Sequence, residues 1–118
     1  MSWTLEDLFG AGATYNPTNK TITFDADSLL DGNNQPWIQN TTPTASQVFA
    51  ALLKHAERVT INSGADKTKG IVAQQQFGES IVIETRDGQS QIYQTHSFRV
   101  YQVTPSVLTS GIDPDNVL

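Results

Sequence analysis

Two ionisable side chains in the last third of the chain could together support acid–base chemistry. The dipeptide Asp87-Gly88 is typical of a two-residue β-hairpin turn, because glycine readily adopts the positive φ that such a turn requires. Counting outward from this turn places Glu79 opposite His96. A Glu–His pair can transfer protons, but such pairs more often form a charge-assisted hydrogen bond that satisfies two polar groups. We therefore predict a structural pair rather than a catalytic one.

A group of aspartates between residues 25 and 31 invites comparison with a calcium-binding loop. An EF-hand loop requires oxygen ligands at fixed positions and a glutamate at the twelfth. Counting from Asp27 places Leu29 at the third position and Ile38 at the twelfth, and counting from Asp25 fails in the same way. These aspartates are more typical of helix caps and turns.

The segment 63–70 contains Lys67-Thr68 in a polar, glycine-containing context, as phosphate loops do. It lacks the glycine that must directly precede the lysine, and it follows the main predicted helix instead of preceding one. The chain also contains no cysteine, which excludes thiolate metal sites and cysteine nucleophiles. We therefore expect no catalytic residue, no cofactor-binding residue and no metal ligand.

The charge balance argues against nucleic acid as a partner. The net charge is −5 and the basic residues are dispersed, whereas phosphate contacts need clustered lysine and arginine. The first residues contain no basic segment followed by an apolar one, and no apolar run approaches the length of a membrane-spanning helix. The expectation is a cytoplasmic protein that contacts neither membrane nor nucleic acid.

The hydrophobic pattern predicts one small α+β domain over residues 1–118. A main helix is predicted over 43–59, with Thr42 as N-cap and Pro43 at the first helical position. At helical spacing its apolar arc contains Ala45, Val48, Phe49, Leu52, Leu53, Ala56 and Val59. A short helix is predicted within 1–10, capped by Thr4 and ended by Gly10, and a short hairpin is predicted around 15–24.

A long β-hairpin over about 71–103 dominates the predicted sheet, against which the main helix would pack. The register that follows from the turn pairs Ile83 with Ile92 and Phe77 with Phe98, and it pairs Ala73 with Gln102. One face of both arms then collects most of the apolar residues, which we expect to point inward: Ile71, Ala73, Phe77, Ile81, Ile83, Ile92, Phe98 and Val100.

The length of this hairpin leaves two alternatives open. Arms of this size would span about 50 Å, whereas a compact domain of this length is only about 35 Å across. The ribbon must therefore either bend, with Gly78 as the favoured position, or project as an arm toward another subunit. Beyond it, residues 104–118 are predicted to form an extended tail that lies along a surface of the same chain or of another one.

We hypothesise that the chain is a non-enzymatic structural or adaptor subunit of a larger assembly, for example a virion, phage or tail-like particle. It would associate with protein partners, as a homo-oligomer or in a multi-subunit complex, through the hairpin and the tail. The candidate interface comprises Gln74, Gln76, Tyr93, Arg99, Tyr101, Leu108, Ile112 and Leu118. The alternatives are a small-ligand-binding module or small enzyme with a pocket near His96 and Glu79, and a small protein regulator or inhibitor.

Overall fold

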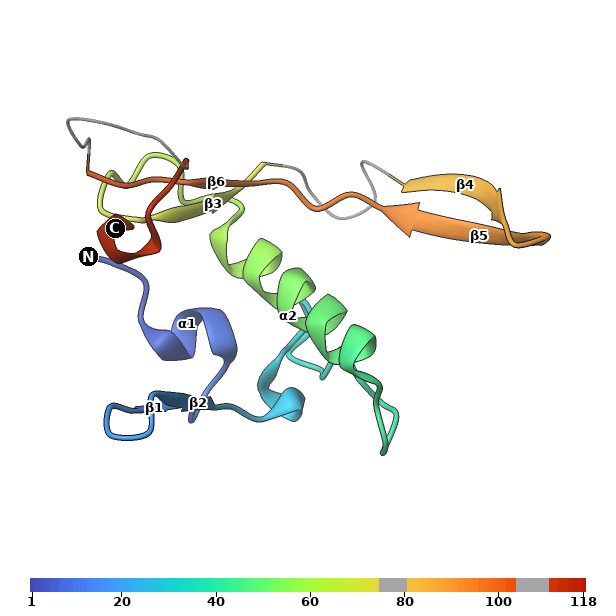
Figure 1. Cartoon of the computed structure of the whole chain (residues 1–118), viewed down its shortest axis with the longest axis horizontal. Helices are drawn as coiled ribbons and strands as arrows, with labels where there is room; N and C mark the ends of the chain where they lie inside the picture. The colour runs from blue at the N-terminus through green and yellow to red at the C-terminus, as the bar shows by residue number, and fades with distance from the viewer. Residues whose placement is uncertain (75–80, 104–110) are drawn as a thin grey trace.

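The computed structural model describes residues 1–74, 81–103 and 111–118 and shows an α+β fold with one main helix and antiparallel strand pairs, as predicted. In these ranges the strands form three two-stranded sheets, β1–β2, β3–β6 and β4–β5 (Figure 1). The elements are α1 (Leu5–Phe9), β1 (Thr14–Asn16), β2 (Thr21–Thr23), η1 (Ala26–Ser28), α2 (Ala45–Thr60), β3 (Ile71–Ala73), β4 (Ile81–Arg86), β5 (Gln89–Gln94), β6 (Phe98–Val100) and η2 (Pro114–Asn116).

The short helix α1 begins and ends as its sequence predicts. The Thr4 hydroxyl accepts a hydrogen bond from the Asp7 N–H at 3.1 Å, and the Asp7 carboxylate accepts one from the Thr4 N–H at 2.8 Å. Gly10 ends the helix with φ 96, a conformation that favours glycine. The predicted first hairpin is also present as β1 and β2, which pair antiparallel.

The main helix α2 begins two residues later than predicted. Its N-cap is Thr44, whose hydroxyl accepts from the Gln47 N–H, while the Gln47 side chain accepts from the Thr44 N–H at 2.9 Å. This reciprocal capping box satisfies two backbone donors at once. Thr42 cannot form the same box because Ala45, not glutamate or glutamine, lies three residues after it.

The predicted apolar arc of α2 is only partly covered. Phe49 is 62% exposed and most of the arc is half-buried, whereas Ala51, His55, Glu57 and Thr60 are buried. Both α1 and β3 pack against this helix. Each of the three buried polar side chains of α2 has a hydrogen-bond partner. Thr60, for example, accepts from the Ala73 N–H of β3 at 3.0 Å.

The hairpin register is confirmed near the turn and wrong at its base. Ile83 pairs with Ile92, but Val100 pairs with Ile71 and Phe98 pairs with Ala73. The base is therefore shifted by four residues, because seven residues separate β3 from β4 and only three separate β5 from β6. An even shift preserves the alternation of faces. The predicted partners Phe77 and Glu79 lie outside the described residues.

Strands β4 and β5 project from the rest of the molecule as an arm (residues 81–94; Figure 1). The molecule measures 48 × 30 × 27 Å, and its radius of gyration of 16.2 Å exceeds the value of about 13–14 Å for a compact chain of this length. The arm projects, whereas Gly78, the favoured position of a bend, lies outside the described residues. Contact of the arm with another subunit stays a prediction. The prediction that this apolar face points inward is wrong here, since Ile83 and Ile92 are each 68% exposed.

The C-terminal residues 116–118 pack against residues 101–103 of their own chain. The Leu118 N–H donates to the Tyr101 carbonyl at 3.0 Å, and the Val103 N–H donates to the Asn116 carbonyl at 3.3 Å. Gly70 is buried beneath this end, where its carbonyl accepts from the Tyr101 N–H at 2.8 Å. A Cβ atom on Gly70 would overlap the Leu118 carbonyl oxygen. The tail is thus held in cis at its end.

The substitution Gly70→Ala tests this close approach. We expect it to lower the free energy of unfolding by about 1–3 kcal/mol, the usual cost of overpacking, measured by urea denaturation. Gly64→Ala is the matched control, because a Cβ there would lie 3.8 Å from Val72, an ordinary contact. Equal stability of the two variants would contradict the described packing of residues 116–118.

Candidate functional site

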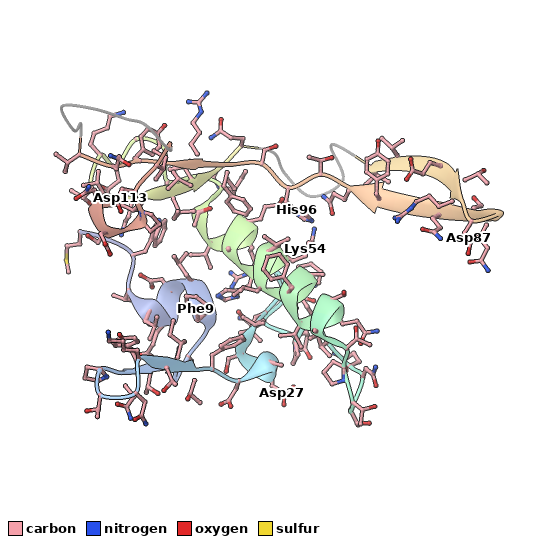
Figure 2. All side chains as sticks on the ribbon, viewed as in Figure 1. Phe9, Asp27, Lys54, Asp87, His96 and Asp113 are labelled. Carbon is pink, nitrogen blue, oxygen red and sulfur yellow. The ribbon has the colours of Figure 1, made fainter. Side chains whose placement is uncertain are left out.

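A polar cluster of Lys54, Glu57, Gln94 and His96 joins α2 to the base of the arm (Figure 2). The His96 Nδ1–H donates to the Glu57 carboxylate at 2.9 Å, and the Lys54 ammonium lies 3.6 Å from the other carboxylate oxygen. Lys54 also donates to the Gln94 side-chain oxygen at 3.4 Å. The Glu57 side chain is 6% exposed and the His96 side chain 14%. Because water is largely excluded, these contacts hold β5 against the helix more firmly than surface pairs would.

His96 has an acid partner that the sequence analysis did not predict, Glu57 on α2. The predicted partner Glu79 lies outside the described residues, so that pairing stays a prediction. The sequence contains little sign of this contact, because Glu57 falls outside the predicted apolar arc and is 39 residues from His96. The available hint was the spacing of Lys54 and Glu57, which places a cation and an anion on adjacent turns of one helix.

The contacts of the cluster fit a structural role at the base of the arm. The Glu57 carboxylate already contacts both His96 and Lys54, one at each oxygen. Burial lowers the pKa of the Lys54 ammonium, and the neighbouring Glu57 carboxylate opposes that shift. Lys54 also lies over the Trp37 ring, 5.2 Å from its centre. The geometry therefore fixes where the arm leaves the body.

The substitution Glu57→Gln tests the cluster. It keeps the shape of the side chain but leaves the part-buried Lys54 without its carboxylate, so we expect a loss of about 2–3 kcal/mol in unfolding free energy. Glu84→Gln is the control, because the Glu84–Arg86 pair is 3.9 Å apart and largely exposed. It should change stability by less than about 0.5 kcal/mol. A Glu57→Gln variant as stable as the Glu84→Gln control would contradict a stabilising role of the cluster.

His55 is a second buried histidine, placed between α1 and residue 30. Its Nδ1 accepts from the Leu30 N–H at 3.2 Å, and its Nε2–H donates to the Asp7 carbonyl at 3.0 Å. Both ring nitrogens are thus satisfied by the neutral form. Burial is the main cause that lowers the pKa of His55, and the nearby Arg58 guanidinium lowers it further.

This lowered pKa predicts acid sensitivity. Below about pH 6.5, His55 takes up a proton in the unfolded chain but resists it in the folded one, so the unfolded state binds more protons and stability falls. We expect unfolding free energy to decrease from pH 7 to pH 5, measured by urea denaturation at each pH. His55→Gln should be less stable at pH 7 yet show a shallower slope. An unchanged slope would show that His55 is not the titrating group.

The side chains of the arm distribute over two faces, both rich in exposed apolar surface. We call the face with Ile81, Ile83 and Ile92 the underside, because Gln94, which alternates onto the same face, contacts Lys54 of α2. The opposite face carries Val82 and Tyr93, 43% and 42% exposed. Strands β4 and β5 pair with each other, and in the described sheets neither has a second neighbour. Two edges and two faces of the arm are therefore available to a partner.

The molecule as a whole exposes more surface than a compact monomer. Its accessible area is 8368 Å², whereas a monomeric protein of 12.9 kDa exposes about 6,300 Å². Within the described ranges the buried apolar residues are few, and all but Leu29 are small: Ala13, Leu29, Ala51, Val72 and Ala73. The whole chain, residues outside those ranges included, exposes about 2,000 Å² more than a compact monomer of its size.

The predicted interface residues fall on separate parts of the molecule. Tyr93 lies on the arm, while Tyr101 and Leu118 come together at a cavity of about 120 Å³ beside Lys69. Gln74, Arg99 and Ile112 are exposed. Gln76 and Leu108 lie outside the described residues. The role of these side chains in binding a partner stays a prediction.

An open groove of about 330 Å³ lies between α2 and residues 37–40. It is lined by Trp37, Ile38, Gln39, Asn40, Gln47, Ala50, Ala51 and Lys54. Its size is at the lower end of small-molecule sites, and His96 is not among its lining residues. In the described ranges no three acidic or histidine side chains are grouped to hold a metal ion. The small-ligand and regulator alternatives stay predictions.

Comparison with known proteins provides no further guide. The chain matches no protein-family profile, no curated protein and no solved structure. No helix in the described parts of the chain is long and apolar enough to cross a membrane.

Proposed function

We propose that this chain is a non-enzymatic structural or adaptor subunit that joins a larger protein assembly through its projecting arm. The observation that carries the proposal is the exposure of Ile83 and Ile92, each 68%, on a two-stranded sheet that stands away from the body. An isolated two-stranded hairpin is only marginally stable in water. A partner that covers the underside would remove apolar surface from water and supply the missing layer.

The size of the uncovered surface supports the same proposal. A standard interface buries about 800 Å² on each partner, and obligate complexes bury more. The surplus of about 2,000 Å² over a compact monomer is enough for such an interface. The arm also carries unpaired strand edges, to which an extended segment of another chain can add by hydrogen bonding.

The wider context that we propose is a multi-subunit particle, of which a virion or a phage tail is an example. Charged residues form only 16% of the sequence, against about 25% in typical domains, so packed surfaces would bury few unpaired charges. The end of the tail is held in cis. Its proposed contribution is therefore limited to exposed side chains such as Ile112 and Leu118, 44% and 39% exposed.

Sedimentation velocity over a range of about 1–200 µM tests the proposal, since specific interfaces hold in this affinity range. The wild-type chain should sediment as an oligomer, and the double substitution Ile83→Ser/Ile92→Ser should shift it to a monomer without lowering its helix content. Ile22→Ser is the control, because Ile22 is an exposed isoleucine (46%) on β2, away from the arm. A wild-type chain that stays monomeric throughout and binds no other protein would overturn the proposal.

A further inference from the structure

A second apolar surface, half-buried near the base of the arm and exposed at Phe49, lies on α2. Glu57 contacts His96, and residues four apart on a helix lie on one face. Stepping back from Glu57 gives Leu53 and then Phe49, which is 62% exposed. We call Phe49 and Leu53 the helix row. It runs from the polar cluster toward the N-terminal end of α2.

The arm underside starts from the same cluster. Gln94 reaches Lys54, Ile92 follows on the same face of β5, and Ile83 is its cross-strand partner on β4. From this common origin α2 and the arm diverge, as Figure 1 shows. Phe49 of the helix row and the underside are therefore exposed, while Leu53 is half-buried, although the sequence pattern predicts that the apolar helix face and the apolar ribbon face cover each other.

We propose that the partner of the arm is a second copy of this chain, and that the underside of each arm packs on the helix row of the other copy. This inference rests on the proposed function and names its partner and docking site. The contact that the sequence pattern predicts within one chain is thereby formed between two chains. Such an exchange is reciprocal and closes as a two-fold dimer.

The charges of the two surfaces permit this contact. Residues 45–53 of the helix contain no charged side chain, and neither do residues 81–83 and 90–94 of the arm. Packing them together therefore leaves no charge buried without a partner, which would otherwise be the largest cost. An aliphatic ribbon face against a helix face that combines aromatic and aliphatic side chains is also an ordinary layer of α+β proteins.

The area available agrees with an obligate dimer. Obligate homodimer interfaces bury about 2,000–5,000 Å² in total, or about 1,000–2,500 Å² on each chain. The surplus of each chain over a compact monomer is about 2,000 Å², which lies within that range. A smaller contact, such as pairing between two arm edges alone, would leave Phe49 exposed.

Because the chain has no cysteine, pairs of introduced cysteines give a direct test. Chains carrying Phe49→Cys and chains carrying Ile83→Cys are purified separately, mixed, equilibrated and oxidised. We expect a disulfide-linked dimer of one chain of each kind. Val82→Cys replaces Ile83→Cys in the matched control, since Val82 lies on the opposite face of the arm, and this control should give little cross-linking.

A single chain that carries both Phe49→Cys and Ile83→Cys distinguishes exchange from folding back. A cross-link within the monomer would mean that the arm covers its own helix, and it would overturn the inference. Linked dimers of the double variant, with no linked monomer, support it.

Phe49→Ser provides the second readout, measured as the dimer dissociation constant by sedimentation. Phe49 is exposed in the isolated chain, so the variant should fold normally, yet the loss of a buried aromatic should weaken the dimer by about tenfold or more. Ala50→Ser, on the groove side of α2, is the control.

The outcomes separate the two proposals. If Ile83→Ser/Ile92→Ser dissociates the oligomer but Phe49→Ser does not, the arm mediates assembly and the inferred docking site is wrong. If the wild-type chain is a monomer at every concentration and binds no other protein, the proposed function fails as well.

Discussion

The attachment of strands β3–β6 to α2 is the constraint on which the rest of the structure depends. This attachment is largely polar. At the end of the helix Thr60 accepts from the Ala73 backbone N–H, and one turn earlier Glu57 binds His96. The buried apolar residues between these elements are small, mainly Ala73 and Val72. These polar contacts set the direction of the strands relative to α2 more than they stabilise the fold. Hydrogen bonds and buried ion pairs add little net free energy but tolerate few geometries.

Local structure was the part that the sequence predicted well. The Thr4 capping box, the first hairpin and the turn at Asp87-Gly88 all depend on residues within a few positions of one another. The turn fixed the register as far as Ile81–Gln94, the last pair of the arm. Beyond this pair the register is shifted, because the two segments that join the arm to β3 and β6 differ in length. The residues of the turn do not predict that difference.

Long-range packing was the part that the sequence could not predict. The helical arc containing Phe49 is the most apolar face of α2, yet the body covers the face with Ala51 and His55. His55 is buried because its ring nitrogens bond the Leu30 N–H and the Asp7 carbonyl. A pattern of apolar residues cannot predict such hydrogen bonds. The contact of His96 with Glu57 was missed for the same reason, because Glu57 reaches His96 only through tertiary packing.

These two results together explain why an exposed apolar pattern points to a second chain. Binary patterning indicates which faces must be covered, but not which chain covers them. For the arm to cover its own helix, the chain would have to bend sharply near His96, where β6 and β5 follow nearly one line (Figure 1). The contact of His96 with the buried Glu57 holds the chain in its present direction at this point. The proposed exchange between two copies would cover the same surfaces and leave that contact in place.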